Sequence, residues 1–338
     1  MGMWRSRTRR ALHSVAPVGV VLLGVLAGAG APLQSGTASA APATRPALVP
    51  VGAGPVQSDH LGAARYLAAH PNAAPAGAND FACKPTADHP RPVVLAHGTD
   101  SSAYSDWSAI APQLAGAGLC VFALNYGGKP DAESYGTEDV FESSAQIGEF
   151  VDQVLAATGA AQVDLVGFSQ GASVTRYYVN KLGGAPKVGQ WIGLASPSYG
   201  GIMYGLVPVA QNAPVLFDLA ELASSEAAIQ QAAGSPFITA LNAGGDTVPG
   251  VRYTTIGSTV DEMIQPNANI ALQGAGATNL VLQQMCADDL TGHFHMVYDP
   301  FVQQLVLALL DPAHAATPVC VPVALGTGIK EVVLAAHS

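Results

Sequence analysis

The chain has 338 residues, of which 49% are hydrophobic and only 11% are charged, and its formal net charge is −10 at pH 7. This sparse and acidic charge excludes the basic surface that nucleic-acid binding needs, so we expect no nucleic-acid partner. The length suits one large α/β domain rather than a small module.

Residues 1–40 have the layout of an export signal. Four arginines within the first ten residues precede an apolar run over residues 15–31, and Ala38 and Ala40 form a small-x-small cleavage motif. The run is short and interrupted by proline, whereas a membrane-spanning helix needs about 20 steadily apolar residues. We therefore expect a cleaved signal peptide, secretion to the extracellular space and no stable membrane anchor. The Sec and Tat export routes both stay open.

Residues 41–78 are expected to form a flexible N-terminal segment, with a short helix over residues 59–70. The first part of the segment consists mainly of Ala, Pro and Gly, which cannot bury enough apolar surface to fold. Residues 79–338 then form the predicted α/β domain, which includes an insertion over 196–250 and an apolar tail over 317–338.

The chain contains four cysteines, an even number that indicates two disulfides in an exported protein. Sequence alone allows three pairings. We favour Cys83 with Cys120 and Cys286 with Cys320, because each pair lies within one half of the chain. None of the cysteines belongs to a C-x-x-C pair, so we expect no zinc site and no other bound metal.

From residue 91 onward, short apolar runs alternate with stretches of helical periodicity. They predict a strand over residues 91–96, a helix over 107–117, a strand over 119–124 and a helix over 138–157. The apolar runs are continuous, which is typical of strands buried on both faces. This alternation predicts a parallel, doubly wound sheet with its active site beyond the carboxyl ends of the strands.

Residues 163–179 have the pattern of a strand, an abrupt turn and a helix, which is the nucleophile-elbow motif G-x-S-x-G. The turn is crowded, and Gly167 and Gly171 suit it because they lack a Cβ. This geometry places the Ser169 hydroxyl above the carboxyl edge of the sheet and directs the N–H of Gln170 to where an oxyanion forms. The motif alone is equally compatible with a structural loop, so the rest of the sequence has to distinguish a catalytic elbow from such a loop.

Two further strands are predicted over residues 191–195 and 251–256, and the segment 196–250 between them is too long for a plain connection. This segment carries Met203 and Leu206 among other apolar residues, so we expect a helical cap that lines an acyl pocket. The alternative is a helical insertion that packs on the sheet without touching substrate. The last predicted elements are a strand over 279–285, a helix over 301–310 and the tail, which we expect to pack on the domain.

On a sheet of this kind, the acid and then the histidine of a catalytic triad follow the serine in chain order. Asp261 follows the strand 251–256 and therefore lies at the catalytic edge, whereas Asp246 precedes that strand and lies at the opposite edge. We therefore choose Asp261 as the acid, with its neighbour Glu262 as the fallback.

His293 and His295 both lie in the loop after the last predicted strand, and only one of them is needed as the base. The residues themselves leave the choice between these two histidines open. A metal-binding function of the His-x-His pair would need further ligands, and the sequence suggests none nearby.

The turn after the first core strand normally supplies the second donor of an oxyanion hole. In this chain that donor is the N–H of Thr99, with the Thr99 hydroxyl as an additional candidate. His97 precedes the nucleophile and lies at the strand end beneath this turn, so we interpret it as structural.

Several stretches together resemble a known family. The residues at 96–99, 124–127, 167–171 and 293–300 resemble the bacterial class 2 triacylglycerol lipases, which belong to the α/β-hydrolase superfamily. Those at 197–201, 242–245 and 261–266 are similar to Candida lipase B. The resemblance spans most of residues 79–312, and its Asp-Glu-x-x-Gln-Pro stretch is far more specific than the serine motif.

The resemblance implies that Ser169 is the nucleophile, that Asp261 orients the base and that His293 is the base. It also implies that Thr99 and Gln170 form the oxyanion hole, and that no cofactor is required. The choice of His293 over His295 rests on this motif.

Two residues depart from the relatives. Gly292 stands where an aspartate usually precedes the catalytic histidine, and Ser198 stands where the yeast enzyme has an aspartate. The second departure affects contacts to the alcohol side of the substrate. The pocket residues that we expect are Ser198, Tyr199, Met203, Leu206 and Ile264.

The predicted function is that of a secreted serine ester hydrolase, a triacylglycerol lipase that works through an acyl-enzyme. The alternatives are a short-chain carboxylesterase or polyester hydrolase, a cell-envelope acyltransferase, and a non-catalytic binding protein. The expected partner is a lipid or ester substrate, including substrate at an oil–water interface, and we expect a monomer. Acyl chain length, lid motion and interfacial activation are not decided by the sequence.

Overall fold

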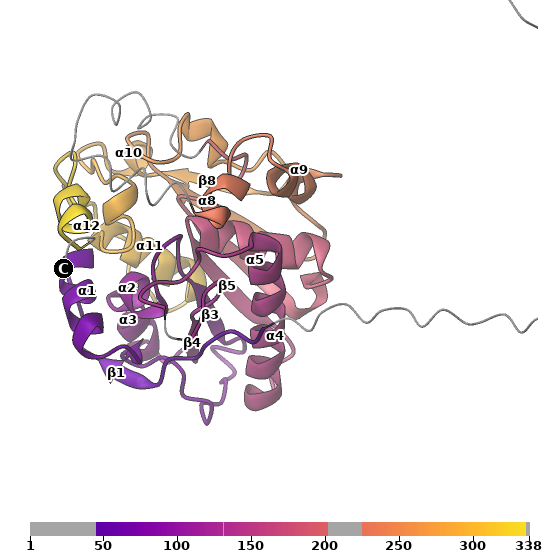
Figure 1. Cartoon of the computed structure of the whole chain (residues 1–338). Helices are drawn as coiled ribbons and strands as arrows, with labels where there is room; N and C mark the ends of the chain where they lie inside the picture. Colours follow the sequence, from indigo (N-terminus) through magenta and orange to yellow (C-terminus); the bar gives the residue numbers. More distant parts are fainter. Residues whose placement is uncertain (1–44, 131, 202–224, 336–338) are drawn as a thin grey trace, which may run out of the picture. The chain divides into compact units, whose positions relative to one another are not determined.

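The computed structural model describes residues 45–130, 132–201 and 225–335 of the chain (Figure 1). The predicted signal peptide over 1–40 lies outside these residues. The centre of the domain is a parallel sheet of six strands in the order β4-β3-β5-β6-β7-β8. The strands are β3 (Val93–Ala96), β4 (Val121–Leu124), β5 (Val163–Phe168), β6 (Val188–Leu194), β7 (Arg252–Gly257) and β8 (Thr278–Val281).

The predicted parallel α/β architecture is confirmed, and the burial of the strands explains it. Every residue of β3, β4 and β5 is buried, as expected for strands covered on both faces. The chain order moves from β3 outward to β4 and then back across β3 to β5. The strand order therefore reverses beside β3 and β5, where an open parallel sheet forms a crevice at its carboxyl edge.

Helices cover both faces of the sheet (Figure 1). One face packs against α2 (Ala103–Trp107), α3 (Ile110–Gly116) and α11 (Pro300–Leu310), with Trp107 fully buried. The other face packs against α4 (Val140–Thr158), α5 (Gln170–Lys181) and α9 (Pro236–Asn242), with Trp191 fully buried. These two apolar layers hold the strands, and therefore the strand ends, in fixed positions.

The N-terminal segment that was expected to be flexible contains regular structure in its described part. It forms β1 (Gly52–Gly54), α1 (His60–Ala69) and β2 (Ala73–Pro75), and β1 and β2 pair in parallel. Asp59 caps α1 by accepting a hydrogen bond from the Gly62 N–H at 2.8 Å. The segment is ordered because Ala63 and Ala73 are buried against Tyr104 of the domain.

The segment between β6 and β7 contains two short helices in its described part, α8 (Glu226–Gln230) and α9. The strand predicted to end at residue 285 is shorter, because β8 ends at Val281 and the chain continues as α10 (Leu282–Met285). The tail forms α12 (Ile329–Ala335), which packs against α1 and the 3₁₀ helix His293–His295. None of the helices among the described residues is long and apolar enough to cross a bilayer.

Two disulfides join segments that are distant in the chain. Cys83 bonds to Cys120, which ties the loop before β3 to the start of β4. Cys286 bonds to Cys320, which ties the end of α10 to the tail. These pairings are the ones that sequence proximity favours, and they suit an oxidising, extracellular environment.

Candidate active site

Ser169 occupies the strained turn between β5 and α5. Its φ of 50° and ψ of −118° lie outside the regions that L-residues usually adopt. A Cβ on Gly167 would overlap the backbone of Ala172, and a Cβ on Gly171 would overlap the carbonyl oxygen of Ala96. The two glycines therefore allow the turn to pack directly against α5 and β3, as the elbow motif predicts.

The structure brings three predicted side chains into one chain of hydrogen bonds. Ser169 Oγ lies 3.0 Å from His293 Nε2, and His293 Nδ1 lies 3.0 Å from Asp261 Oδ2. The three residues come from the ends of β5, β7 and β8 or the loops that follow them. Asp261 is fully buried, and only 7% of Ser169 and 5% of His293 are exposed. A hydroxyl, an imidazole and a carboxylate in this order can generate a nucleophilic oxygen.

The electrostatic surroundings favour a protonated imidazole at His293. Burial by itself would lower the pKa of His293, and the Asp261 carboxylate opposes this effect most strongly. Glu262 and Asp106 act in the same direction, so the pKa of His293 lies above its ordinary value. These surroundings therefore stabilise an imidazolium at His293.

Asp261 is held in place by the loop after β7. Its Oδ1 accepts hydrogen bonds from the N–H groups of Met263 and Ile264 at 2.9 and 2.7 Å, which leaves Oδ2 for His293. Asp246, the competing acid, instead accepts a hydrogen bond from the Tyr199 hydroxyl. The structure therefore brings Asp261, and not Asp246, to the histidine.

Thr99 and Gln170 face one another at the ends of β3 and β5. Neither backbone N–H donates to an acceptor within the described part of the chain, so both are available to a substrate oxygen. The Thr99 hydroxyl accepts hydrogen bonds from Gln170 Nε2 and Gln231 Nε2, each at 3.1 Å. The same Nε2 atoms also donate to the carbonyl oxygens of Gly136 and Ala227, which fixes the orientation of both amides. Because the hydroxyl accepts twice, its own proton is free to point to a third group.

Asp106 holds the turn that follows β3 through two hydrogen bonds. Its Oδ2 accepts a hydrogen bond from the Gly98 N–H and its Oδ1 accepts one from the Ser101 hydroxyl, both at 2.7 Å. Asp106 is fully buried, and this burial raises its pKa to about 6. His60 of α1 approaches the same carboxylate at 3.9 Å. The sequence gives no motif that would identify Asp106 or His60.

Glu262 holds the backbone of the predicted base. Its Oε2 accepts a hydrogen bond from the His293 N–H at 2.6 Å, and burial raises the pKa of Glu262. A Cβ on Gly292 would overlap this carboxylate. The glycine that departs from the relatives therefore leaves the space that Glu262 occupies.

The other histidines near the strand ends have different partners. His97 is fully buried, its Nε2 accepts a hydrogen bond from the Tyr126 N–H at 3.3 Å, and burial lowers the pKa of His97 to about 4. These contacts fit the structural interpretation of His97. Within the described residues, His295 makes no hydrogen bond to Ser169 or Asp261.

Three of the predicted pocket residues lie in the described part of the chain. Ser198 is fully buried and its hydroxyl donates to the Ile270 carbonyl at 2.8 Å. Tyr199 donates to Asp246 at 2.5 Å, and Ile264 is buried in an apolar cluster with Met263 and Phe294. The remaining two, Met203 and Leu206, lie outside the described residues.

Comparison with known proteins identifies the family and the fold. The model of the family described as Lipase (class 2) matches residues 90–306, which is more than half of the chain. The chain belongs to the class 2 lipase family. The resemblance expected from the motifs is thereby confirmed. The matched region contains Thr99, Ser169, Asp261 and His293.

Two solved structures show the same fold. The chain resembles Aspergillus fumigatus lipase B with a TM-score of 0.58 and 22% sequence identity, over 78% of this chain and 63% of that chain. It therefore spans less than two thirds of the Aspergillus protein. It also resembles mature Bacillus licheniformis lipase BlEst2 with a TM-score of 0.51 and 17% identity, over 67% of this chain and 94% of that one. The likeness confirms the predicted α/β-hydrolase fold.

Proposed function

We propose that this protein is a secreted carboxylic ester hydrolase of the triacylglycerol lipase type. The observation that carries the proposal is the hydrogen-bonded chain from Ser169 through His293 to Asp261, at 3.0 Å for each step. Family membership supports an ester substrate, and the two disulfides support an extracellular location.

The first step is attack by the Ser169 oxygen on the carbonyl carbon of the ester. His293 Nε2 accepts the hydroxyl proton, and Asp261 stabilises the resulting imidazolium through Nδ1. The N–H groups of Thr99 and Gln170 bind the oxyanion, and His293 then gives its proton to the departing alcohol. An acyl group remains on Ser169.

The second step is hydrolysis of the acyl-enzyme. His293 removes a proton from water, the hydroxide attacks the acyl carbon, and the Ser169 oxygen leaves and regains a proton. The same oxyanion donors act in both steps. Loss of one preorganised donor of this kind raises the barrier by about 3 to 4 kcal/mol.

The decisive experiment measures hydrolysis rates for nitrophenyl esters of increasing acyl length together with an emulsified triglyceride. A triacylglycerol lipase cleaves the emulsion and prefers medium or long acyl chains. Preference for the shortest ester without cleavage of the emulsion would identify a short-chain carboxylesterase instead. Ser169→Ala is the control, and wild-type hydrolysis by that variant would overturn the whole assignment.

A further inference from the structure

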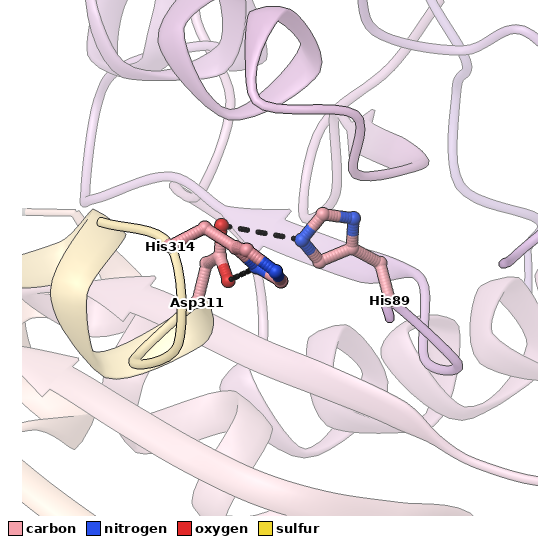
Figure 2. Close-up of side chains that lie close together, drawn as sticks. All are labelled: His89, Asp311 and His314. Carbon is pink, nitrogen blue, oxygen red and sulfur yellow. Dashed lines mark hydrogen bonds and ion pairs between the residues drawn. The ribbon is translucent and has the colours of Figure 1, made fainter. Parts of the chain in front are cut away.

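A cluster of metal-ligating side chains lies outside the candidate active site. It consists of His89, Asp311 and His314, whose side chains point toward one another (Figure 2). His89 belongs to the loop before β3, Asp311 follows the last residue of α11, and His314 lies in the next turn. The cluster therefore lies near the start of β3. Thr99 of the candidate active site follows the other end of this strand.

The potential ligand atoms of the cluster lie close to one another, at distances of the same order as those around one metal ion. His89 Nε2 lies 3.2 Å from Asp311 Oδ2, and His314 Nδ1 lies 2.7 Å from Asp311 Oδ1. One ligand atom from each residue can be chosen so that all three lie within 4.8 Å of one another. Bonds of 2.0–2.2 Å to a tetrahedral zinc ion place neighbouring ligand atoms roughly 3.4 Å apart.

His89 shows that the cluster is more than a set of exposed side chains. Only 11% of its side chain is exposed, and its Nε2 is buried and makes no hydrogen bond within the described residues. The same atom lies 3.2 Å from the Asp311 carboxylate, but without the alignment of a hydrogen bond. A buried nitrogen close to a carboxylate, and not bonded to it, is suited to share a cation with it.

The backbone holds the three ligands in position. The His89 N–H donates to Thr86 Oγ1 at 3.1 Å, which closes the loop that presents the imidazole. Asp311 ends α11, and its N–H donates to the Leu307 carbonyl at 2.8 Å. The His314 N–H donates to the Asp311 carbonyl at 3.3 Å, so both residues belong to the same turn.

The charges and exposure of the cluster also suit a divalent cation. The Asp311 carboxylate supplies negative charge, and an imidazole lies on each side of it, at 3.2 Å for His89 and 2.7 Å for His314. Asp88 adds a second negative charge near His314. The His314 side chain is 54% exposed, which leaves one side of the cluster open to solvent.

We propose that His89 Nε2, Asp311 and His314 Nδ1 bind one Zn²⁺ ion, with water as the fourth ligand. Two imidazoles and one carboxylate form a borderline nitrogen and oxygen donor set that suits zinc. The ion joins the end of α11 to the loop before β3, two segments that are far apart in the sequence. Its role is structural, because the cluster contains none of the residues of the candidate active site.

The test is calorimetric titration of Zn²⁺ into purified protein that has been treated with a chelator, followed by thermal unfolding. We expect one ion per chain. At a zinc concentration of about 100 times the dissociation constant, we expect the Tm to rise by about 5 °C. Co²⁺ in place of Zn²⁺ should give the visible absorption of a tetrahedral site.

His314→Ala and His89→Ala remove one ligand each from the two segments, and both should abolish the binding heat and the Tm shift. His314→Ala should disturb folding less than His89→Ala, because the His314 side chain is half exposed. The matched control is His70→Ala, which removes an exposed histidine that stacks on Tyr66 and should leave zinc binding unchanged.

Absence of a binding heat in the wild type would overturn the proposal and leave Asp311 as an ion-pair partner of two histidines. A Tm shift that persists unchanged in either ligand variant would also overturn it. Both measurements are made without substrate, so their outcome is independent of the proposed ester hydrolysis.

Discussion

His293 is held at three points, two through its ring and one through its backbone. The ring nitrogens contact Ser169 and Asp261, and the N–H donates to Glu262 Oε2 at 2.6 Å. Glu262 therefore positions the imidazole and also contributes negative charge that raises the pKa of His293. From sequence, Glu262 is only a fallback for Asp261, but in the structure it holds the backbone of His293.

Glu262→Gln tests the electrostatic part of this role. Glutamine keeps an acceptor for the His293 N–H but removes the charge, so the pKa of His293 should fall toward its ordinary value. Because His293 acts as a base only when neutral, the acidic limb of the pH–rate profile should move to lower pH. The measurement is kcat/KM for a soluble ester as a function of pH. Glu149→Gln in α4 is the control, and an identical limb in both variants would contradict the prediction.

The Thr99 hydroxyl offers a second test at the residue scale. Gln231 Nε2 donates to this hydroxyl, which leaves the Thr99 proton free for the oxyanion. In Gln231→Glu the carboxylate would accept that proton and turn it away from the substrate. We expect kcat to fall about a hundredfold, as for loss of one oxyanion donor, with a smaller change in KM.

Gln153→Glu is the matched control for this change, because it introduces the same charge at an exposed position of α4. Steady-state kinetics of the two variants make the comparison. A Gln231→Glu enzyme with wild-type kcat would show that the Thr99 hydroxyl does not serve the oxyanion.

The sequence predicts the residues of the hydrogen-bonded chain because each follows a recognisable strand. Ser169 is marked by its glycines, and Asp261 by its place after an apolar run. The partners of Gln231 and Glu262 lie far away in the chain, so no local pattern reveals these supporting contacts. Asp106 contacts residues only five and eight positions before it, but it belongs to no recognisable motif. The choice between His293 and His295 depends on side-chain direction, which the residues alone do not reveal.

At the scale of elements, the elbow works because α5 approaches β3 without any side chain between them. A Cβ on Gly171 would overlap the Ala96 carbonyl oxygen, which belongs to a buried strand and has no room to move. Gly171→Ala should therefore lower the free energy of unfolding by about 3 kcal/mol and disturb Ser169. Chemical unfolding and ester hydrolysis measure the two effects.

Gly116→Ala is the control for the glycine substitution. Gly116 is the last residue of α3 and a Cβ there would meet no atom within 4 Å. This change should leave activity intact and stabilise the protein by about 0.5 kcal/mol, because alanine is favoured over glycine in helices. Equal stability of the two variants would contradict the packing argument at the elbow.

Elements are predictable from sequence where the apolar pattern is local, and less so where tertiary contacts decide. Continuous apolar runs mark β3, β4 and β5, which are buried throughout. Helix α1 lies within the range predicted for it, but no apolar run marks β1, and contacts with Tyr104 order this segment. The end of β8 was placed too late because an apolar run continues from the strand into α10.

At the scale of the whole domain, the C-terminal tail returns to the catalytic edge of the sheet. The Leu290 N–H donates to the Val323 carbonyl at 3.0 Å, and the Cys286–Cys320 disulfide joins the same two segments of the chain. Ile329 and Val332 of α12 then pack on an apolar cluster of Met263, Ile264, Ile270 and Phe294. Met263 lies two residues after Asp261 and Phe294 directly follows His293, so the tail supports both loops at once.

Replacing Ile329 and Val332 together with serine tests this support. Each side chain is partly buried, so the pair should lower the free energy of unfolding by about 2 kcal/mol. Both loops should also loosen, because the apolar surface beside Asp261 and His293 loses its cover. We therefore expect kcat to fall several-fold at a temperature well below Tm, where the variant is fully folded. Leu334→Ser, on the same helix but 42% exposed, should change neither quantity. A double variant that loses stability but keeps wild-type kcat would show that the tail stabilises the fold without positioning the active site.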